Sequence, residues 1–199
     1  MMSRKNKSET LFESFCRANA LDWERIPPSA EKTADYRLQL GTTSVVVEVE
    51  QIESVAGFSL TGVSSRTVGS HVRHKIAEAR KQLQIVAATG EPTILLIFNA
   101  VDPLQLFGTE QHDFLCAMYG ELTVHLSQDG AIGPSFHGRN AKLRPDTNTS
   151  FSGVGHLREQ RAGTASVTVY ENIHAAHPLP FGHFPSCIEV LRVRAQDAA

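Results

Sequence analysis

Three carboxylates gather on a predicted β-hairpin that spans residues 35–51. Asp35 begins the first strand, and Glu48 and Glu50 lie two residues apart in the second strand. Residues two apart share a face of a strand, so Glu48 and Glu50 point to the same side. Carboxylates opposite one another across strands repel each other unless a cation offsets their charge, and Mg²⁺ prefers oxygen ligands. The spacing therefore predicts a Mg²⁺ site suited to phosphodiester chemistry; a solvated acidic strand face is the alternative.

The apolar pattern of the hairpin predicts its register. A two-residue turn at 41–42 pairs Tyr36 with Val47, and this pairing puts the apolar faces of both strands on the same side. The same register places Asp35 opposite Glu48. A shift of one residue would mix the apolar and polar faces, so the pattern and the turn support the same pairing.

These residues resemble the motif of a known family. Asp, then a hairpin, then Glu-x-Lys on a strand is the core of the PD-(D/E)XK, or restriction-endonuclease-like, nuclease superfamily; this chain reads Ala34-Asp35 and then Glu48-Val49-Glu50. Ala34 stands where the family name has Pro. Glu50 stands where Lys is usual, and that Lys orients or activates the attacking water in the family. The resemblance implies that Asp35 and Glu48 bind the metal, and that Glu50 binds a second metal or acts as a general base.

A first predicted helix carries another acidic candidate. Residues 8–20 form an apolar helical face, with Ser8 as the N-cap. Members of the superfamily often place a Glu on this helix near the metal, so the resemblance implies Glu9 as an outer metal ligand. Glu13 points further out by helical angle. Both residues could instead be exposed helix carboxylates.

The second helix, predicted at residues 70–89, has the strongest periodic pattern in the chain. Its apolar residues recur at spacings of three and four, and Ser70 is the expected N-cap. Superfamily members often carry a Gln or Lys on this helix, aimed at the active site. Lys75 flanks the buried stripe and is the expected replacement for the missing Lys, whereas Lys81 points away; Gln82 would position water or phosphate. An ordinary amphipathic helix with a basic solvated face is the alternative.

The order of the elements predicts an α/β fold. Residues 93–99 are a continuous apolar run, typical of a central parallel strand, so a βαβ crossover connects 44–50 to 93–99. Residues 8–100 resemble the core of the superfamily. We expect a restriction-endonuclease-like mixed sheet flanked by helices, with a β-rich C-terminal extension of the same domain over 101–199. The extension is expected to contain a helix at 109–119 capped by Thr109, strands at 121–127, 151–157, 165–171 and 187–194, and long loops over 128–150.

Three further features have weaker interpretations. Arg139, Lys142 and Arg144 form a local basic cluster that could contact phosphate, although a solvated loop is the better interpretation. The histidines at 174–183 could bind Zn²⁺, but no fourth ligand lies nearby and their spacing matches no closed zinc motif. The Gly-, Ser- and Thr-rich segment 53–69 predicts either a mobile loop that faces the substrate or a plain surface connection.

Composition narrows the class of protein. The chain has 199 residues and a net charge of −2, which predicts one domain over 1–199 without the global basic charge of many nucleic-acid binders. Three scattered cysteines with no CxxC spacing indicate free thiols in a reducing compartment. No apolar run approaches the ~20 residues of a membrane span, and no signal-peptide core follows the basic N-terminus. We therefore expect a cytoplasmic protein without a membrane partner.

These observations together predict a Mg²⁺-dependent deoxyribonuclease, in which Mn²⁺ can substitute for Mg²⁺ and DNA is the partner. A homodimer is one assembly that the sequence allows. The alternative is a catalytically degenerate nuclease-fold module that binds nucleic acid or a protein partner. Glu50 in place of Lys is the feature that supports this alternative.

Overall fold

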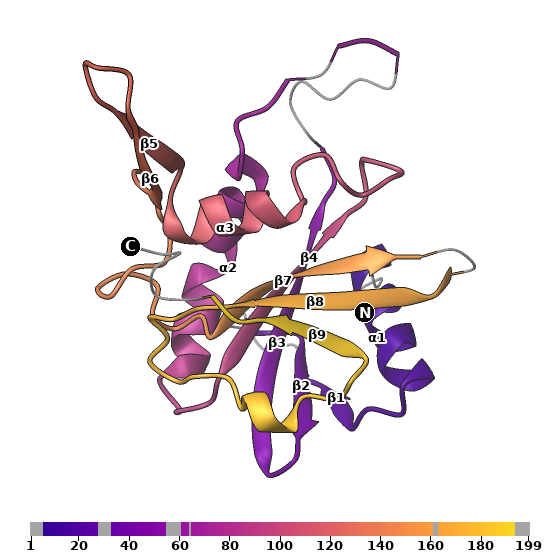
Figure 1. The fold of residues 1–199 in the computed structure, drawn as a ribbon. Coiled ribbons are helices and arrows are strands. Elements are labelled where there is room, and N and C mark those ends of the chain that lie inside the picture. The colour runs from indigo at the N-terminus through magenta and orange to yellow at the C-terminus, as the bar shows by residue number, and fades with distance from the viewer. Residues whose placement is uncertain (1–5, 28–32, 55–60, 64, 161–162, 194–199) are drawn as a thin grey trace.

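The computed structural model describes residues 6–27, 33–54, 61–63, 65–160 and 163–193 (Figure 1). Residues 55–60 and 64 of the loop predicted at 53–69 therefore lie outside the described residues. The elements in chain order are α1 (Lys7–Ala18), β1 (Trp23–Arg25), β2 (Tyr36–Leu40), β3 (Thr43–Ile52), α2 (Ser70–Ala87), β4 (Thr93–Asn99), α3 (Gln111–Tyr119), β5 (Leu122–Leu126), β6 (Ile132–His137), β7 (Gly153–Glu159), β8 (Ala165–Glu171) and β9 (Ile188–Leu191).

One mixed sheet forms the centre of the fold, in the strand order β1-β2-β3-β4-β7-β8-β9. β2 pairs antiparallel with both β1 and β3, and β4 pairs parallel with both β3 and β7. This arrangement confirms the predicted βαβ crossover through α2. Strands from both 8–100 and 101–199 belong to this sheet, because β4 pairs directly with β7. The prediction of an α/β fold with a mixed sheet flanked by helices is therefore confirmed.

The hairpin has the predicted register. Tyr36 pairs with Val47, and Leu40 pairs with Thr43 across the two-residue turn. Successive strand residues alternate between two apolar cores: Val47 joins the core beneath α1, and Val46 joins the core beneath α2 and α3. All residues of β4 are buried, as expected of a central strand covered on both faces.

The helices begin at other residues than the sequence pattern predicted. Asn6, not Ser8, caps α1, because its side chain accepts the Glu9 N–H while the Glu9 carboxylate accepts the Asn6 N–H. Gly69, not Ser70, precedes α2 with a φ of 74°, which glycine adopts at no steric cost. Glu110, not Thr109, caps α3. The caps at Asn6 and Glu110 are capping boxes with an acidic residue three positions later, whereas the Gly69 N–H is held by Asp113 of α3.

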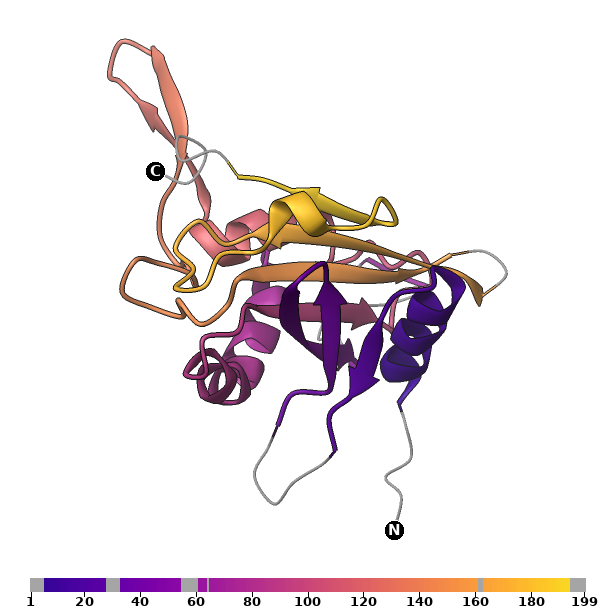
Figure 2. The same cartoon turned by 90° about the horizontal axis from the view of Figure 1, so that it is seen from below.

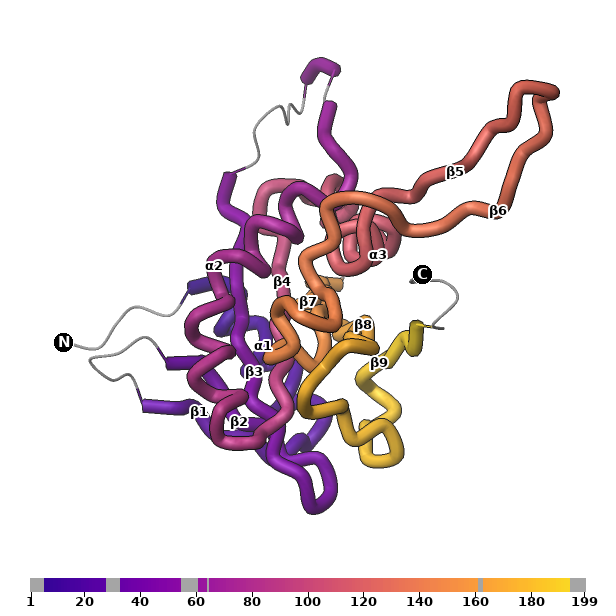
Figure 3. Tube along the Cα trace, turned by 90° about the vertical axis from the view of Figure 1, so that its left-hand side faces the viewer, coloured from indigo at the N-terminus to yellow at the C-terminus, as the bar shows by residue number. Residues whose placement is uncertain are grey.

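The predicted loops at 128–150 contain a strand. β6 pairs with β5 in a two-stranded antiparallel arm, which projects from the body in all three views (Figure 1, Figure 2 and Figure 3). Gly133 and Pro134 interrupt the strand pattern, and the arm lies outside both cores, so β6 has no apolar alternation. The arm leaves Leu126 and Ile132 about three-quarters exposed, at 73% and 74%.

None of the helices in the described ranges has the length and apolar character that a bilayer span requires.

Candidate active site

The predicted residues on β3 and α2 do meet. The Gln82 side-chain amide donates to Glu48 Oε1 at 2.8 Å, and the Lys75 ammonium lies 3.1 Å from Glu50 Oε2. Helix α2 runs back along strand β3. Lys75, the earlier residue in the helix, therefore meets Glu50, the later residue in the strand, and Gln82 meets Glu48. Glu48 and Gln82 are both buried, whereas Lys75 and Glu50 keep a small part of their side chains exposed.

The Lys75 ammonium lies beside a carboxylate of β3, that of Glu50. It lies between Glu50 and Glu78, 2.8 Å from the Glu78 carboxylate. Burial lowers the pKa of Lys75, but hydrogen bonds and the charges of Glu78 and Glu50 outweigh burial, so its pKa is raised. Lys75 is therefore a fixed cation at neutral pH and is suited to binding phosphate rather than to removing a proton. A hollow of about 220 Å³ opens beside it, lined also by His71 and His74.

Asp35 lies just before β2, and its carboxylate turns back to β3. The Val49 N–H donates to Asp35 Oδ2 at 2.9 Å. Burial raises the pKa of Asp35 to about 6; the Val49 hydrogen bond opposes this, and the charges of Glu9 and Glu50 add to it. Asp35, Glu9 and Glu50 are thus electrostatically coupled, although they come from three separate segments. A cation at this place would relieve the repulsion between them.

Glu9 reaches the site from α1, and Arg25 accompanies it. The guanidinium of Arg25 lies 2.9 Å from Glu9 Oε1, while the other Glu9 oxygen accepts the Asn6 N–H at 3.0 Å. Glu9 therefore acts first as a helix cap and an ion-pair partner. Arg25 also lowers the pKa of Asp35 through its charge, a contribution that the sequence analysis did not include.

The prediction that Glu13 points outward was wrong. Its side chain is only 3% exposed and accepts a hydrogen bond from the Tyr36 hydroxyl at 3.1 Å. Arg17, one turn later in α1, forms an ion pair with the second oxygen at 2.7 Å. The large ring of Tyr36 packs under α1, and its polar end needs a buried acceptor, which helical angle alone could not show.

The acidic residues of the site are coupled but do not form a closed set of ligands. Across the described residues, the group of three or more potential ligands whose atoms all lie within 4.8 Å of one another is Glu110, His112 and Asp113. Glu48 and Glu50 are drawn toward α2 by Gln82 and Lys75 instead.

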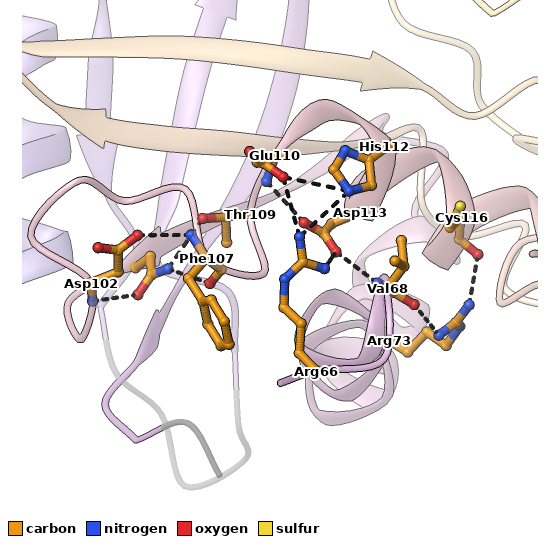
Figure 4. Close-up of polar contacts among 12 residues, drawn as sticks. Arg66, Val68, Arg73, Asp102, Phe107, Thr109, Glu110, His112, Asp113 and Cys116 are labelled. Atoms are coloured by element: carbon orange, nitrogen blue, oxygen red, sulfur yellow. Dashed lines mark hydrogen bonds and ion pairs between the residues drawn. The ribbon is translucent and has the colours of Figure 1, made fainter. Parts of the chain in front are cut away.

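The Glu110 group already holds a cation of the chain itself. Arg66 forms an ion pair with the fully buried Asp113 and lies 3.2 Å from Glu110 Oε2 and 3.4 Å from His112 Nε2 (Figure 4). Asp113 also accepts the Gly69 N–H at 2.8 Å, which joins the start of α2 to α3. A metal ion here would have to displace a guanidinium, so the group is a structural clamp. The sequence analysis missed it, because Arg66 lies in a segment without helix or strand periodicity.

The C-terminal histidines and the buried cysteines do not gather into a site. The histidines at 174–183 belong to no ligand group among the described residues. The ring of His174 packs against Tyr119, and burial lowers the pKa of His174. Cys16 and Cys116 are free and buried, and burial raises the pKa of Cys16 to about 12. A buried thiol of such high pKa is a poor nucleophile.

Comparisons with protein-family models, with curated proteins and with solved structures found no match for this chain.

Proposed function

We propose that this protein is a Mg²⁺-dependent nuclease that hydrolyses phosphodiester bonds of DNA. The observation that carries the proposal is the position of Lys75. The chain lacks Lys at position 50, where the PD-(D/E)XK motif has one, yet Lys75 reaches Glu50 from α2 and carries its charge into the same acidic site. A fixed cation beside coupled carboxylates is the combination that phosphoryl transfer requires.

The donor set suits Mg²⁺. Asp35 and Glu48 would hold the ion, with Glu50 at a second ion and Glu9 as an outer ligand, because hard cations prefer carboxylate oxygens. The raised pKa of Asp35 is compatible with this assignment: burial is its largest cause, and the charges of Glu9 and Glu50 add to it, so a cation beside the carboxylate would favour its ionised form. When bound, Mg²⁺ would supply Lewis-acid activation of the phosphate and of the attacking water.

The other residues have roles that follow from their contacts. Gln82 donates to Glu48 and to the Thr33 carbonyl, so it holds the Glu48 carboxylate in one orientation. Lys75 is charged at neutral pH and would stabilise negative charge that develops on the phosphate oxygens. Glu50 lies 3.1 Å from this cation and would accept the proton of the attacking water.

A cleavage assay tests the proposal. Single- and double-stranded DNA would be incubated with Mg²⁺, Mn²⁺ or EDTA, with wild type, Asp35→Ala and Glu48→Ala. We expect metal-dependent cleavage that falls about 1,000-fold in each variant, because several kcal/mol of transition-state stabilisation are lost. Glu110→Gln is the matched control and should keep its activity, since Glu110 belongs to the Arg66 clamp. Cleavage that survived Asp35→Ala and Glu48→Ala would overturn the assignment.

The role of Lys75 needs its own comparison. Lys75→Ala should lower kcat by about 100-fold, as expected for the loss of one preorganised charge that acts on the transition state. Lys81→Ala is the control, because Lys81 lies on the same helix but is exposed. Equal rates for the two variants would show that Lys75 does not replace the family Lys.

One observation favours a second candidate, a nuclease-fold module without catalytic activity. The Glu50 carboxylate is already neutralised by Lys75 at 3.1 Å, so this part of the site has an internal cation. A non-catalytic module would show no heat stabilisation by Mn²⁺, and Asp35→Ala would not change its binding to nucleic acid. An active nuclease would show the opposite result in both measurements.

A further inference from the structure

The face of α2 that points away from the acidic site borders a large groove. Arg73, Ala77 and Arg80 recur at spacings of four and three and therefore share one helix face. The segment 138–148, which follows the β5–β6 arm, lies opposite this face. A cavity of about 1050 Å³ separates the two.

The lining of this groove is strongly basic although the chain as a whole is slightly acidic, with a net charge of −2. Its positively charged side chains come from two distant parts of the sequence, and in the described lining they face one carboxylate, Glu121. Local potential, not net charge, attracts a polyanion. The cationic residues are Arg73 and Arg80 on α2 and Arg139, Lys142 and Arg144 on the opposite segment.

These side chains divide into a structural part and a free part. The Arg73 guanidinium donates to the carbonyls of Val68, Cys116 and Asn140, at 2.8, 3.1 and 3.1 Å, so it builds the floor of the groove. Arg144 lies at the rim, where Thr147 accepts its hydrogen bond at 2.9 Å.

The free part is formed by Arg80, Arg139 and Lys142. Within the described part of the chain, their side chains have no hydrogen bond or ion pair, and Arg80 and Arg139 are exposed. Cations held close to one another without counter-charges repel each other, so an anionic ligand would stabilise this arrangement.

The dimensions of the groove suit a chain of phosphates. Arg73 and Arg80 are seven residues apart, or about 10 Å along the helix axis. This length corresponds to about three nucleotides at the 3.4 Å rise of one DNA strand. Ala77, which is exposed between them, has a small side chain, so a DNA backbone can approach the helix closely.

The groove lies next to the hollow beside Lys75. His74 lines both the groove and the 220 Å³ hollow, so the two spaces border the same residue of α2. We propose that the groove binds the phosphodiester backbone of DNA, without reading its sequence, and guides the strand across α2 to the acidic site. The binding of DNA depends on the groove alone, whereas guidance of the strand to the acidic site rests on the proposed function.

The test is DNA binding in EDTA, where no cleavage occurs. Fluorescein-labelled single- and double-stranded DNA would be titrated with wild type and with the triple variant Arg80→Gln, Arg139→Gln, Lys142→Gln over a range of NaCl concentrations. Each phosphate contact contributes about 0.9 to the slope of log Kobs against log[salt] for duplex DNA, so the slope should fall by about 2 to 3. Affinity at about 100 mM salt should fall at least 10-fold. Lys81→Gln removes a positive charge next to Arg80 but outside the groove and should change neither value.

Two results would overturn the inference. One is a triple variant, folded by thermal melting, whose salt slope equals that of Lys81→Gln. The other is displacement of DNA by inorganic phosphate more strongly than by NaCl of equal ionic strength, which would indicate a site for single phosphates. The two proposals can fail separately. DNA binding in EDTA tests the groove, and cleavage tests the nuclease: Asp35→Ala should abolish cleavage but bind DNA through the groove as wild type does. If both proposals hold, the triple variant raises KM and keeps the wild-type kcat.

Discussion

Two acidic clusters of this protein look alike in composition but differ in what occupies them. Around Asp35, the carboxylates come from α1, from the segment before β2 and from β3, and Lys75 neutralises one of them from the side. Around Asp113, the carboxylates lie on one short stretch of chain and share a single guanidinium, that of Arg66. The Asp113 cluster is geometrically the tighter one, yet it is the less suitable for a metal.

The difference shows that close carboxylates alone do not define a metal site. Asp113 is fully buried and its charge is compensated by Arg66 and by two backbone N–H groups, of Gly69 and Glu110. Asp35 accepts one backbone N–H, and its pKa is raised by burial first and by the charges of Glu9 and Glu50 in addition, while Arg25 offsets part of the rise. Charge that the fold leaves uncompensated points to a ligand, whereas charge that the fold compensates points to stability. Substitutions and titrations at the two clusters test this distinction.

The clamp should be essential for stability. Asp113→Ala should lower the free energy of unfolding by about 3–5 kcal/mol, because it leaves the Arg66 charge without its buried partner and removes an acceptor for two backbone donors. Denaturant unfolding would measure the change. His112→Ala, at the exposed edge of the same cluster, should stay within about 0.5 kcal/mol of wild type. A loss below about 1 kcal/mol for Asp113→Ala would contradict the structural interpretation.

Stabilisation by a metal ion should depend on the Asp35 cluster and not on the Glu110 cluster. At a Mn²⁺ concentration about 100 times its Kd, wild type should gain about 2.7 kcal/mol of stability. For a chain of this size the gain corresponds to about 5–10 °C in Tm, measured by calorimetry. Asp35→Asn should abolish the shift and Glu110→Gln should keep it. The reverse pattern would assign the metal to the Glu110 cluster, and the distinction drawn between the two acidic clusters would then be wrong.

The pH dependence of stability should reveal the uncompensated charge of Asp35. Its pKa is raised from 3.8 to about 6 on folding, so the folded state holds the proton more tightly than the unfolded state. Ionisation of Asp35 therefore lowers the stability of the folded state. The loss is absent below about pH 4, grows between about pH 4 and pH 6, and is complete above about pH 6. Asp35→Asn, which keeps an acceptor for Val49, should be more stable than wild type at pH 7 by about 1–3 kcal/mol. Equal stabilities from pH 4 to pH 7 would show that the charge is already compensated.

The Lys75–Glu50 pair should contribute the smallest effect on stability. A double-mutant cycle with Lys75→Met and Glu50→Gln should give a coupling of about 0.5–1 kcal/mol, because both side chains are partly exposed. The same cycle with Lys81→Met in place of Lys75→Met should give no coupling. A coupling of several kcal/mol would make the pair a structural clamp like that of Arg66 and would argue against a role for Lys75 in binding phosphate.

Much of the core could be predicted from the sequence, because its signals are local. The alternation around Tyr36 and Val47 set the hairpin register, and the turn at 41–42 agreed with it. The periodicity of α2 and the apolar run of β4 predicted the crossover and its parallel pairing. Helical angle also placed Lys75 and Lys81 correctly relative to the buried face, since the angle depends only on position in the helix.

Contacts between distant segments could not be read in the same way. The burial of Glu13 depends on the Tyr36 hydroxyl, and the start of α2 depends on the contact of Gly69 with Asp113. The basic groove is a further case, because Arg80 and Lys142 are far apart in the sequence and have no pattern in common. In each case the residues that lie near one another are more than twenty positions apart in the sequence.

Periodicity and turn chemistry act over a few residues. The strands and helices of the core, and the acidic residues that share a strand face, could therefore be predicted from the sequence. Only the tertiary structure decided which carboxylates are compensated and which are not. Electrostatic compensation depends on the positions of Lys75, Arg25 and Arg66 in space, and on the burial that weakens screening by water. Those positions follow from the packing of whole elements against one another.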